Sequence, residues 1–194
     1  MENAATSVTA TPTATAPTPI PSPTLCPLPT IIVPTPPAEV PGYAKLDETT
    51  GLHMTGIVPE IDFATYRLEI TGKVDNPLSL TYDALRCMPT VEVHSVLVCP
   101  GFFEDEGTWS GVPITHLLEL AGVQPDATEI RMRGGDLYRT SLDLDMVREG
   151  EGYIIAYEWE GEPLPILHGF PVRGVFPGQE GNKWVKWMLE IEVR

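Results

Sequence analysis

The sequence predicts an α+β domain with more strand than helix, behind a proline-rich N-terminal segment. Apolar and polar residues alternate as in strands over several stretches, whereas helical periodicity occurs in two short ones. Strands and helices do not alternate regularly along the chain. The pattern therefore excludes the βαβ units of a nucleotide-binding sheet.

Each expected element has a local signal. Residues 79–88 begin with a Ser/Thr cap and end at Pro89, which predicts a short helix, and 113–122 has a first-turn proline, an apolar face and a final glycine, which predicts a second. In the stretch 91–99, alternation gives way to a wholly apolar run, as in a strand that enters the core. The expected strands are 65–74, 91–99, 129–134, 137–144, 152–161 and 183–194.

A change of composition near residue 42 divides the chain. Residues 1–41 contain eleven of the 21 prolines and no lysine, arginine, aromatic residue or glycine. Such a segment lacks the apolar bulk to offset the entropy of ordering its backbone. We expect residues 1–42 to form a disordered Pro/Thr-rich stalk or linker, either a spacer from a cell surface or a tail without function, and 43–194 to form one domain.

The charge of the folded part limits its partners. The net charge is −15, and only two of the acidic residues lie in the stalk. Nucleic acids and anionic membranes are therefore poor partners for this domain, and no apolar run in the chain is long enough to span a membrane. A few cations gather at Arg173, Lys183 and Lys186, which is compatible with an anionic ligand or with ordinary solvated surface charge.

The three cysteines, Cys26, Cys87 and Cys99, have no decisive spacing. An odd count argues against a disulfide framework, and a bridge between Cys87 and Cys99 is allowed by the spacing but not required by it. The four histidines form no pair with zinc-ligand spacing. On these grounds alone, Cys99 is most simply a small apolar residue of the core.

The surroundings of Cys99 change that interpretation. The segments "VLVCPGF", "W.GVPITHLLELAG", "GGDLYRTSLDLDM" and "HGFPVRGVFPGQEGNKWVKW" occur in this order between Pro59 and the C-terminal strand. Together they resemble the molybdopterin-binding domain of the sulfite oxidase family, which includes periplasmic sulfoxide reductases. The most specific part is "HGFPVR" followed by "PG" and "VKW".

The resemblance implies a fold of mixed β-sheets with peripheral helices and a molybdenum–molybdopterin cofactor. Cys99 occupies the position of the thiolate ligand to the metal, and a soft thiolate suits molybdenum. The cofactor-binding positions correspond to His168, Arg173 and the stretch Lys183, Trp184, Val185 and Lys186, where basic side chains would bind the pterin phosphate. His53 is a further candidate for the pterin, and Tyr138 corresponds to a catalytic tyrosine beside the metal.

The sequence departs from the family just after Cys99, where sulfite oxidases carry arginines. Here Glu104, Asp105 and Glu106 would repel an anion such as sulfite. We therefore expect a molybdenum-cofactor oxidoreductase that transfers an oxygen atom to or from, or reduces, a small non-anionic substrate. The alternative is a non-catalytic binding or surface-display module that kept the fold without the metal. No haem or flavin motif is present, so an external redox partner protein is expected. An extracytoplasmic location is also expected.

Overall fold

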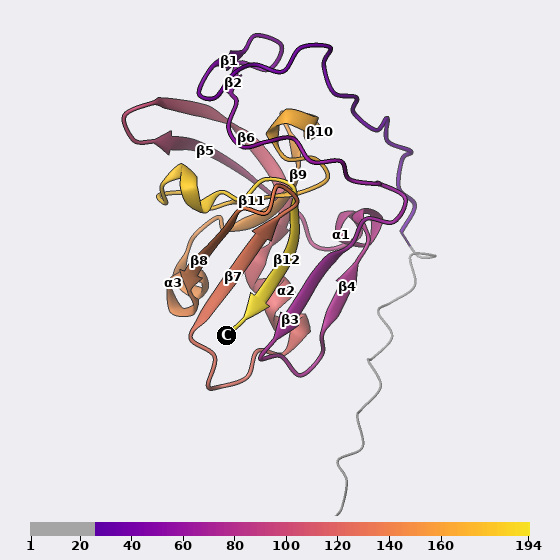
Figure 1. The fold of residues 1–194 in the computed structure, drawn as a ribbon. Coiled ribbons are helices and arrows are strands. Elements are labelled where there is room, and N and C mark those ends of the chain that lie inside the picture. Colours follow the sequence, from indigo (N-terminus) through magenta and orange to yellow (C-terminus); the bar gives the residue numbers. More distant parts are fainter. Residues whose placement is uncertain (1–25) are drawn as a thin grey trace, which may run out of the picture.

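The computed structural model describes residues 26–194, which form two five-stranded sheets, a two-stranded ribbon and a few short helices (Figure 1). This arrangement of mixed sheets with few helices confirms the predicted α+β class. The strands are β1 (Leu46–Asp47), β2 (Leu52–His53), β3 (Leu68–Gly72), β4 (Leu78–Leu80), β5 (Val91–Cys99), β6 (Phe103–Pro113), β7 (Glu129–Gly134), β8 (Arg139–Asp143), β9 (Ile154–Trp159), β10 (Glu162–Pro163), β11 (Arg173–Val175) and β12 (Met188–Val193).

One sheet has the strand order β4-β3-β12-β7-β8. Its central strand, β12, runs parallel to β3 and antiparallel to β7, which makes this sheet mixed. The alternation read from the sequence is seen in its burial, because Leu68, Ile70 and Ile191 have no or almost no exposed surface while their neighbours are partly exposed. The buried face of this sheet forms a large part of the core.

The second sheet is antiparallel and has the order β10-β9-β6-β5, with β11 also paired to β9. Its most prominent feature is the long β5–β6 hairpin, whose register runs from Val91 opposite Gly111 to Cys99 opposite Phe103. The hairpin extends beyond the rest of the sheet toward the β1–β2 ribbon (Figure 1). Cys99 therefore lies beside the turn at the far end of this hairpin.

The helices are short and connect the sheets: α1 (Tyr82–Arg86), α2 (Ile114–Ala121), α3 (Leu144–Glu149) and the 3-10 turns η2 (Ile166–His168) and η3 (Gly181–Lys183). The Thr81 side chain caps α1 by accepting a hydrogen bond from the Ala84 amide. Gly122 ends α2 in a left-handed conformation that favours glycine. None of the helices in the described part of the chain has the length and apolar character needed to cross a bilayer.

Several elements differ from the sequence-based expectation. Strand β6 was not predicted, and the predicted strand 137–144 ends at Asp143, whose side chain caps α3 by accepting from the amides of Asp145 and Met146. The predicted strand 183–194 begins only at Met188, because residues 181–183 form η3. These differences matter for function, since β6 and the segment before β12 both line the candidate site.

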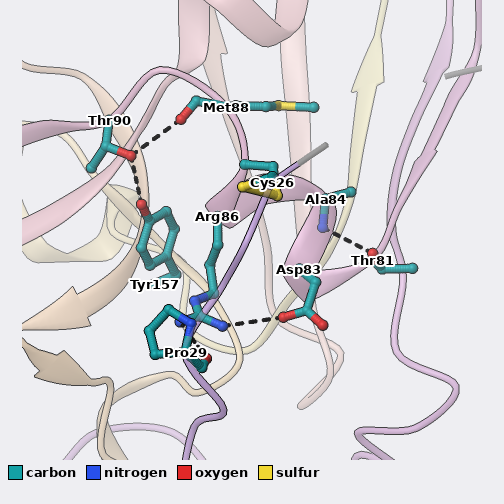
Figure 2. Close-up of a disulfide and its surroundings, with 10 residues drawn as sticks. Cys26, Pro29, Thr81, Asp83, Ala84, Arg86, Met88, Thr90 and Tyr157 are labelled. Atoms are coloured by element: carbon teal, nitrogen blue, oxygen red, sulfur yellow. Dashed lines mark hydrogen bonds and ion pairs between the residues drawn. A yellow bond between two sulfur atoms is a disulfide. The ribbon is translucent and has the colours of Figure 1, made fainter. Parts of the chain in front are cut away.

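The cysteines also correct an expectation, because Cys26 and Cys87 form a disulfide with a Cα–Cα distance of 5.8 Å (Figure 2). This bridge fixes the start of the described chain to the end of α1, where Arg86 also donates to the Pro29 carbonyl at 3.1 Å.

Residues 26–42 have no helix or strand. Residues 1–25 of the predicted stalk lie outside the described residues, so the disorder expected there stays a prediction.

Candidate active site

A cavity of about 280 Å³ lies between the tip of the β5–β6 hairpin, the β1–β2 ribbon and the segments on either side of β11. This volume is close to the lower end of the range of about 300 to 1,000 Å³ seen for ligand pockets. The cavity brings together residues far apart in the sequence, including every predicted site residue except Lys183. Those that line it are His53, Cys99, Tyr138, His168, Arg173, Trp184, Val185 and Lys186.

Cys99 is the free cysteine of the described residues, and it is partly buried at the cavity wall. Burial raises the pKa of its thiol, and the carboxylates of Asp105 and Glu180 raise it further. A reactive nucleophilic cysteine needs the opposite environment, in which positive charge lowers the thiol pKa. A bound metal cation would supply the missing positive charge and stabilise the thiolate, so this site fits a ligand better than a nucleophile.

Two buried cations face the cavity without an acidic partner. Arg173 donates one hydrogen bond to the His168 carbonyl at 3.1 Å, and its buried Nε has no partner within the described residues. Lys186 donates to the Leu167 carbonyl at 3.0 Å, and neither cation makes an ion pair in this part of the chain. Burial lowers the pKa of Arg173 to about 10 and that of Lys186 well below its usual value. Buried charges that lack partners are costly, so an anionic ligand fits here.

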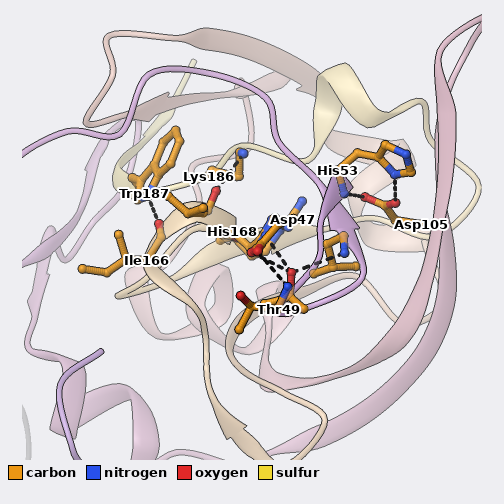
Figure 3. A network of polar contacts seen from close by, with 12 residues as sticks. Asp47, Thr49, His53, Asp105, Ile166, His168, Lys186 and Trp187 are labelled. Carbon is orange, nitrogen blue, oxygen red and sulfur yellow. Dashed lines mark hydrogen bonds and ion pairs between the residues drawn. The ribbon is translucent and has the colours of Figure 1, made fainter. Parts of the chain in front are cut away.

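His168 lies at the base of the cavity in η2, with a side chain that is 2% exposed. Its Nε2 lies 3.0 Å from Oδ2 of Asp47 and 3.0 Å from the hydroxyl of Thr50 (Figure 3). Gly169 follows with a φ of +121°, a conformation that L side chains rarely adopt. A Cβ at this position would also meet the Cβ of Arg173 at 2.9 Å, so glycine allows the two site residues to approach.

His53 and Asp105 form the opposite wall. Asp105 accepts from the His53 backbone amide at 2.8 Å, and its other oxygen lies 2.6 Å from His53 Nδ1 (Figure 3). The His53 ring stacks on Phe103 with centroids 4.5 Å apart. Glu104 and Glu106 are exposed because they alternate with Asp105 along β6. Of the three acids expected to repel an anion, only Asp105 lines the cavity.

Two predicted site residues are placed differently from the rest. Tyr138 lines the cavity, but its hydroxyl donates to the Asn182 carbonyl at 2.8 Å, and burial raises its pKa. This hydroxyl reaches a substrate only by exchanging that hydrogen bond. Lys183 points away, because its Nζ bonds the Ser141 carbonyl at 2.9 Å and the Thr140 hydroxyl at 3.2 Å on β8. The geometry gives Lys183 a structural contact between η3 and β8 rather than a place in the cavity.

Several residues that line the cavity, or that contact its lining residues, were not among the sequence-based site candidates. Asp47 and Thr50 lie in the polar stretch "KLDETT", which matches no motif, yet they hold His168. Asp136 and Asn182 line the cavity from two turns. Asp136 and Asn182 both lie within segments that carry the family resemblance, "GGDLYRTSLDLDM" and "HGFPVRGVFPGQEGNKWVKW", so these two were within reach of sequence reasoning.

Comparison with known proteins identifies the family. The family model described as "Oxidoreductase molybdopterin binding domain" matches residues 55–194. The chain belongs to this family. An uncharacterized oxidoreductase of Bacillus subtilis, YuiH, is 34% identical over 140 residues, covering 71% of this chain and 70% of that protein. The resemblance inferred from the sequence motifs is thereby confirmed.

Other members of the family carry more specific names. A putative protein-methionine-sulfoxide reductase subunit, YedZ1 of Azospira oryzae, is 32% identical over 136 residues, which is 70% of this chain and 52% of that protein. Sulfite oxidases and nitrate reductases also match. The crystal structure of the sulfane dehydrogenase SoxCD from Paracoccus pantotrophus superposes with a TM-score of 0.65 at 28% identity, over 70% of this chain and 40% of that one. The domain thus spans only part of most of these relatives.

Membership of the family makes the chain a molybdopterin-dependent oxidoreductase domain, and the cavity fits that cofactor. Arg173 and Lys186 would hold its phosphate, and the Cys99 thiolate would bind the metal. The described residues contain no group of three or more His, Cys, Asp or Glu side chains that could hold a metal. A metal here would therefore depend on the pterin for further ligands. When bound, the cofactor supplies two-electron redox chemistry, while the protein supplies orientation and electrostatics.

Proposed function

We propose that this domain catalyses oxygen-atom transfer to or from, or reduction of, a small substrate without negative charge, a sulfoxide or N-oxide being the best candidate class. The observation that carries the proposal is the arrangement of the cavity, which is lined by Cys99 and Asp105 and by two cations, Arg173 and Lys186, that make no ion pair within residues 26–194. Reduction of a sulfoxide consumes two electrons and two protons and yields a thioether and water.

The electrostatics around Cys99 support a non-anionic substrate. Burial raises the pKa of the Cys99 thiol, and the negative charges of Asp105 and Glu180 raise it further. At an effective dielectric constant of about 20, a like charge about 6 Å away opposes an anion by about 3 kcal/mol before screening. His53 lies within 2.6 Å of Asp105 and reduces this effect, so we expect a preference and not an exclusion.

An external redox partner and an extracytoplasmic location belong to the same proposal. The sequence has no haem or flavin motif, so another protein must exchange electrons with the cofactor. The net charge of −15 suits a basic partner. The Cys26–Cys87 disulfide supports an oxidising compartment, because such bonds are rare in the reducing cytosol.

The test is to purify the full chain from a host that makes molybdopterin and to measure molybdenum per protein, then turnover with artificial electron donors and acceptors. We expect stoichiometric molybdenum and a higher kcat/KM for a neutral sulfoxide than for sulfite or nitrate. A protein without molybdenum would instead be the non-catalytic module that kept the fold. Efficient sulfite oxidation with no response to changes at Asp105 would contradict the substrate class but not the cofactor.

A further inference from the structure

The β1–β2 ribbon contacts both walls of the cavity, although it precedes the region matched by the family model. At one end Asp47 and Thr50 bond the ring of His168, and at the other end His53 bonds Asp105 (Figure 3). The ribbon thus covers the cavity through two histidine–carboxylate pairs. The pair between Asp47 and His168 is the more buried of the two, with both side chains less than a tenth exposed.

The contacts around His168 decide where its ring proton lies. An ionised carboxylate can only accept hydrogen bonds, so the Asp47 oxygen 3.0 Å from Nε2 requires a proton on that nitrogen. The Thr50 hydroxyl already donates to Oδ2 of Asp47 at 2.9 Å and therefore also presents a lone pair to Nε2. Burial would raise the pKa of Asp47, but hydrogen bonds from His168, Thr50 and Thr49 outweigh it and lower the pKa.

The same surroundings keep His168 uncharged at neutral pH. Its pKa is lowered to about 4, first by burial and then by the charges of Lys186 and Arg173, while Asp47 acts in the opposite direction. A neutral imidazole with its proton on Nε2 carries a lone pair on Nδ1. Nδ1 makes no hydrogen bond to any residue between 26 and 194, so it is available to a ligand.

We propose that Asp47 is a positioning residue for the cofactor site, which holds His168 as the Nε2–H tautomer so that Nδ1 accepts a hydrogen bond from an N–H or O–H group of the bound pterin. The site then has two kinds of contact. Arg173 and Lys186 supply positive charge for the phosphate, and His168 supplies a neutral acceptor for a donor group. The inference rests on the cofactor that the family binds and not on the proposed substrate.

The first measurement needs no substitution. Histidine labelled with nitrogen-15 in the full cofactor-free chain reports the tautomer of each ring by NMR, and the chain has only four histidines. A His168→Gln variant identifies the His168 signals by their loss. We expect the Nε2–H tautomer of His168 from about pH 6 upward, because its pKa is lowered to about 4. A proton on Nδ1, or on both nitrogens at neutral pH, would overturn the proposal.

The second measurement uses Asp47→Asn, with Glu48→Gln as the matched control from the same ribbon. An asparagine side chain can donate as well as accept, so it no longer requires a proton on Nε2. Outer-shell partners of this kind typically contribute about 10- to 100-fold to affinity. We expect Asp47→Asn to lose the single tautomer and to bind molybdopterin at least about tenfold more weakly, with an unchanged far-UV circular dichroism spectrum. Glu48→Gln, at an exposed position, should match the wild type.

The outcomes separate this inference from the function itself. Equal cofactor affinity in wild type and Asp47→Asn would overturn the role of Asp47 and leave the enzyme intact. A wild type that binds no molybdopterin would overturn the function, whereas the tautomer of His168 would still test the proton assignment. If Asp47→Asn does not fold, Thr50→Val is the variant to measure in its place. Its affinity for molybdopterin should fall by about threefold, because it loses one neutral hydrogen bond. No loss in that variant would count against the proposal.

Discussion

On one side of the cavity, Arg173 and Lys186 are buried with no acidic partner in the described chain, whereas on the other side Asp105 is satisfied by His53 beside Cys99. On the first side the two cations need a bound anion to balance their charge. On the second side the Asp105 carboxylate already has a partner in His53. We infer from this difference that Arg173 and Lys186 serve to bind an anionic group, whereas Asp105 and His53 set the electrostatic environment of Cys99.

The largest effect is expected at Cys99. Cys99→Ser has nearly the same shape, so the domain should fold and keep the phosphate contacts on the other side of the cavity. Activity should fall by at least about a thousandfold, because a hydroxyl is a poor donor for a metal that prefers thiolate. The measurement is turnover per bound pterin, with circular dichroism as the folding control. Wild-type turnover in this variant would contradict the assignment of the ligand.

The burial of His168 beside Lys186 and Arg173 should also make the stability of the domain depend on pH. The pKa of His168 is lowered from 6.5 to about 4, first by burial and then by Lys186 and Arg173, with Asp47 acting in the opposite direction. At a pH between 4 and 6.5, the His168 side chain is protonated in the unfolded chain but stays neutral in the folded chain. The free energy of unfolding should therefore fall as pH drops from 6.5 to about 4, by about 3 kcal/mol for this group.

Urea denaturation of the cofactor-free protein at pH 7 and pH 4.5 measures this loss. Other groups titrate in the same range, so the comparison is with His168→Gln, which lacks the titrating ring. The variant should lose less stability over this interval than the wild type. An equal loss in both proteins would show that His168 is not the cause.

The third effect separates cofactor binding from folding. Lys186→Met keeps the length of the side chain but removes a buried charge, so it should leave the cofactor-free protein as stable as the wild type or more stable. Cofactor affinity should fall by about 10- to 100-fold, since a hydrogen bond to a charged group contributes about 1.5 to 3 kcal/mol. The cofactor affinity of Arg173→Ala should fall by a similar factor.

Lys183→Ala is the control from the neighbouring turn, because its Nζ bonds β8 and does not line the cavity. It should keep cofactor affinity near the wild-type value. A loss as large as that of Lys186→Met would restore Lys183 to the phosphate site, as the sequence motif first indicated.

The smallest effect is expected on substrate choice. Asp105→Asn should raise kcat/KM for sulfite relative to a neutral sulfoxide by about tenfold at low salt, and less at high salt, because screening weakens the charge effect. Glu104→Gln and Glu106→Gln, which alternate with Asp105 but are exposed, should change the ratio by less than about twofold. If all three variants behave alike, the placement of Asp105 carries no substrate selectivity.

Local patterns predicted part of this structure well. Strand β5 has the same bounds as its prediction, and α2 lies one residue inside the predicted stretch at each end, with the predicted glycine as its C-cap. Strand β6 was missed because its alternate buried positions are Asp105, Gly107, Trp109 and Gly111, so only one of them is a large apolar residue. The cysteine pairing could not be read either, because 61 residues separate Cys26 from Cys87 and no local signal connects them.

The candidate site was predictable where its residues belong to short motifs. Cys99, His168, Arg173 and Lys186 were found by motif and lie together at the cavity. Asp47 was not found, because a carboxylate that acts by contacting another side chain leaves no pattern of its own. The direction of the Lys183 side chain could not be predicted either. A sequence motif says which residues are adjacent, but not to which side of the backbone each side chain points.

Strand β12 occupies the middle of its sheet, yet it follows every other strand of that sheet in the sequence. During synthesis on the ribosome, β3 and β4 are separated from β7 and β8 until residues 188–193 have been made. Trp184, Val185 and Lys186, which immediately precede β12, reach their places in the cavity only when this strand enters the gap. The cavity that fits the cofactor is therefore complete only after residues 188–193 have been made and have joined the sheet.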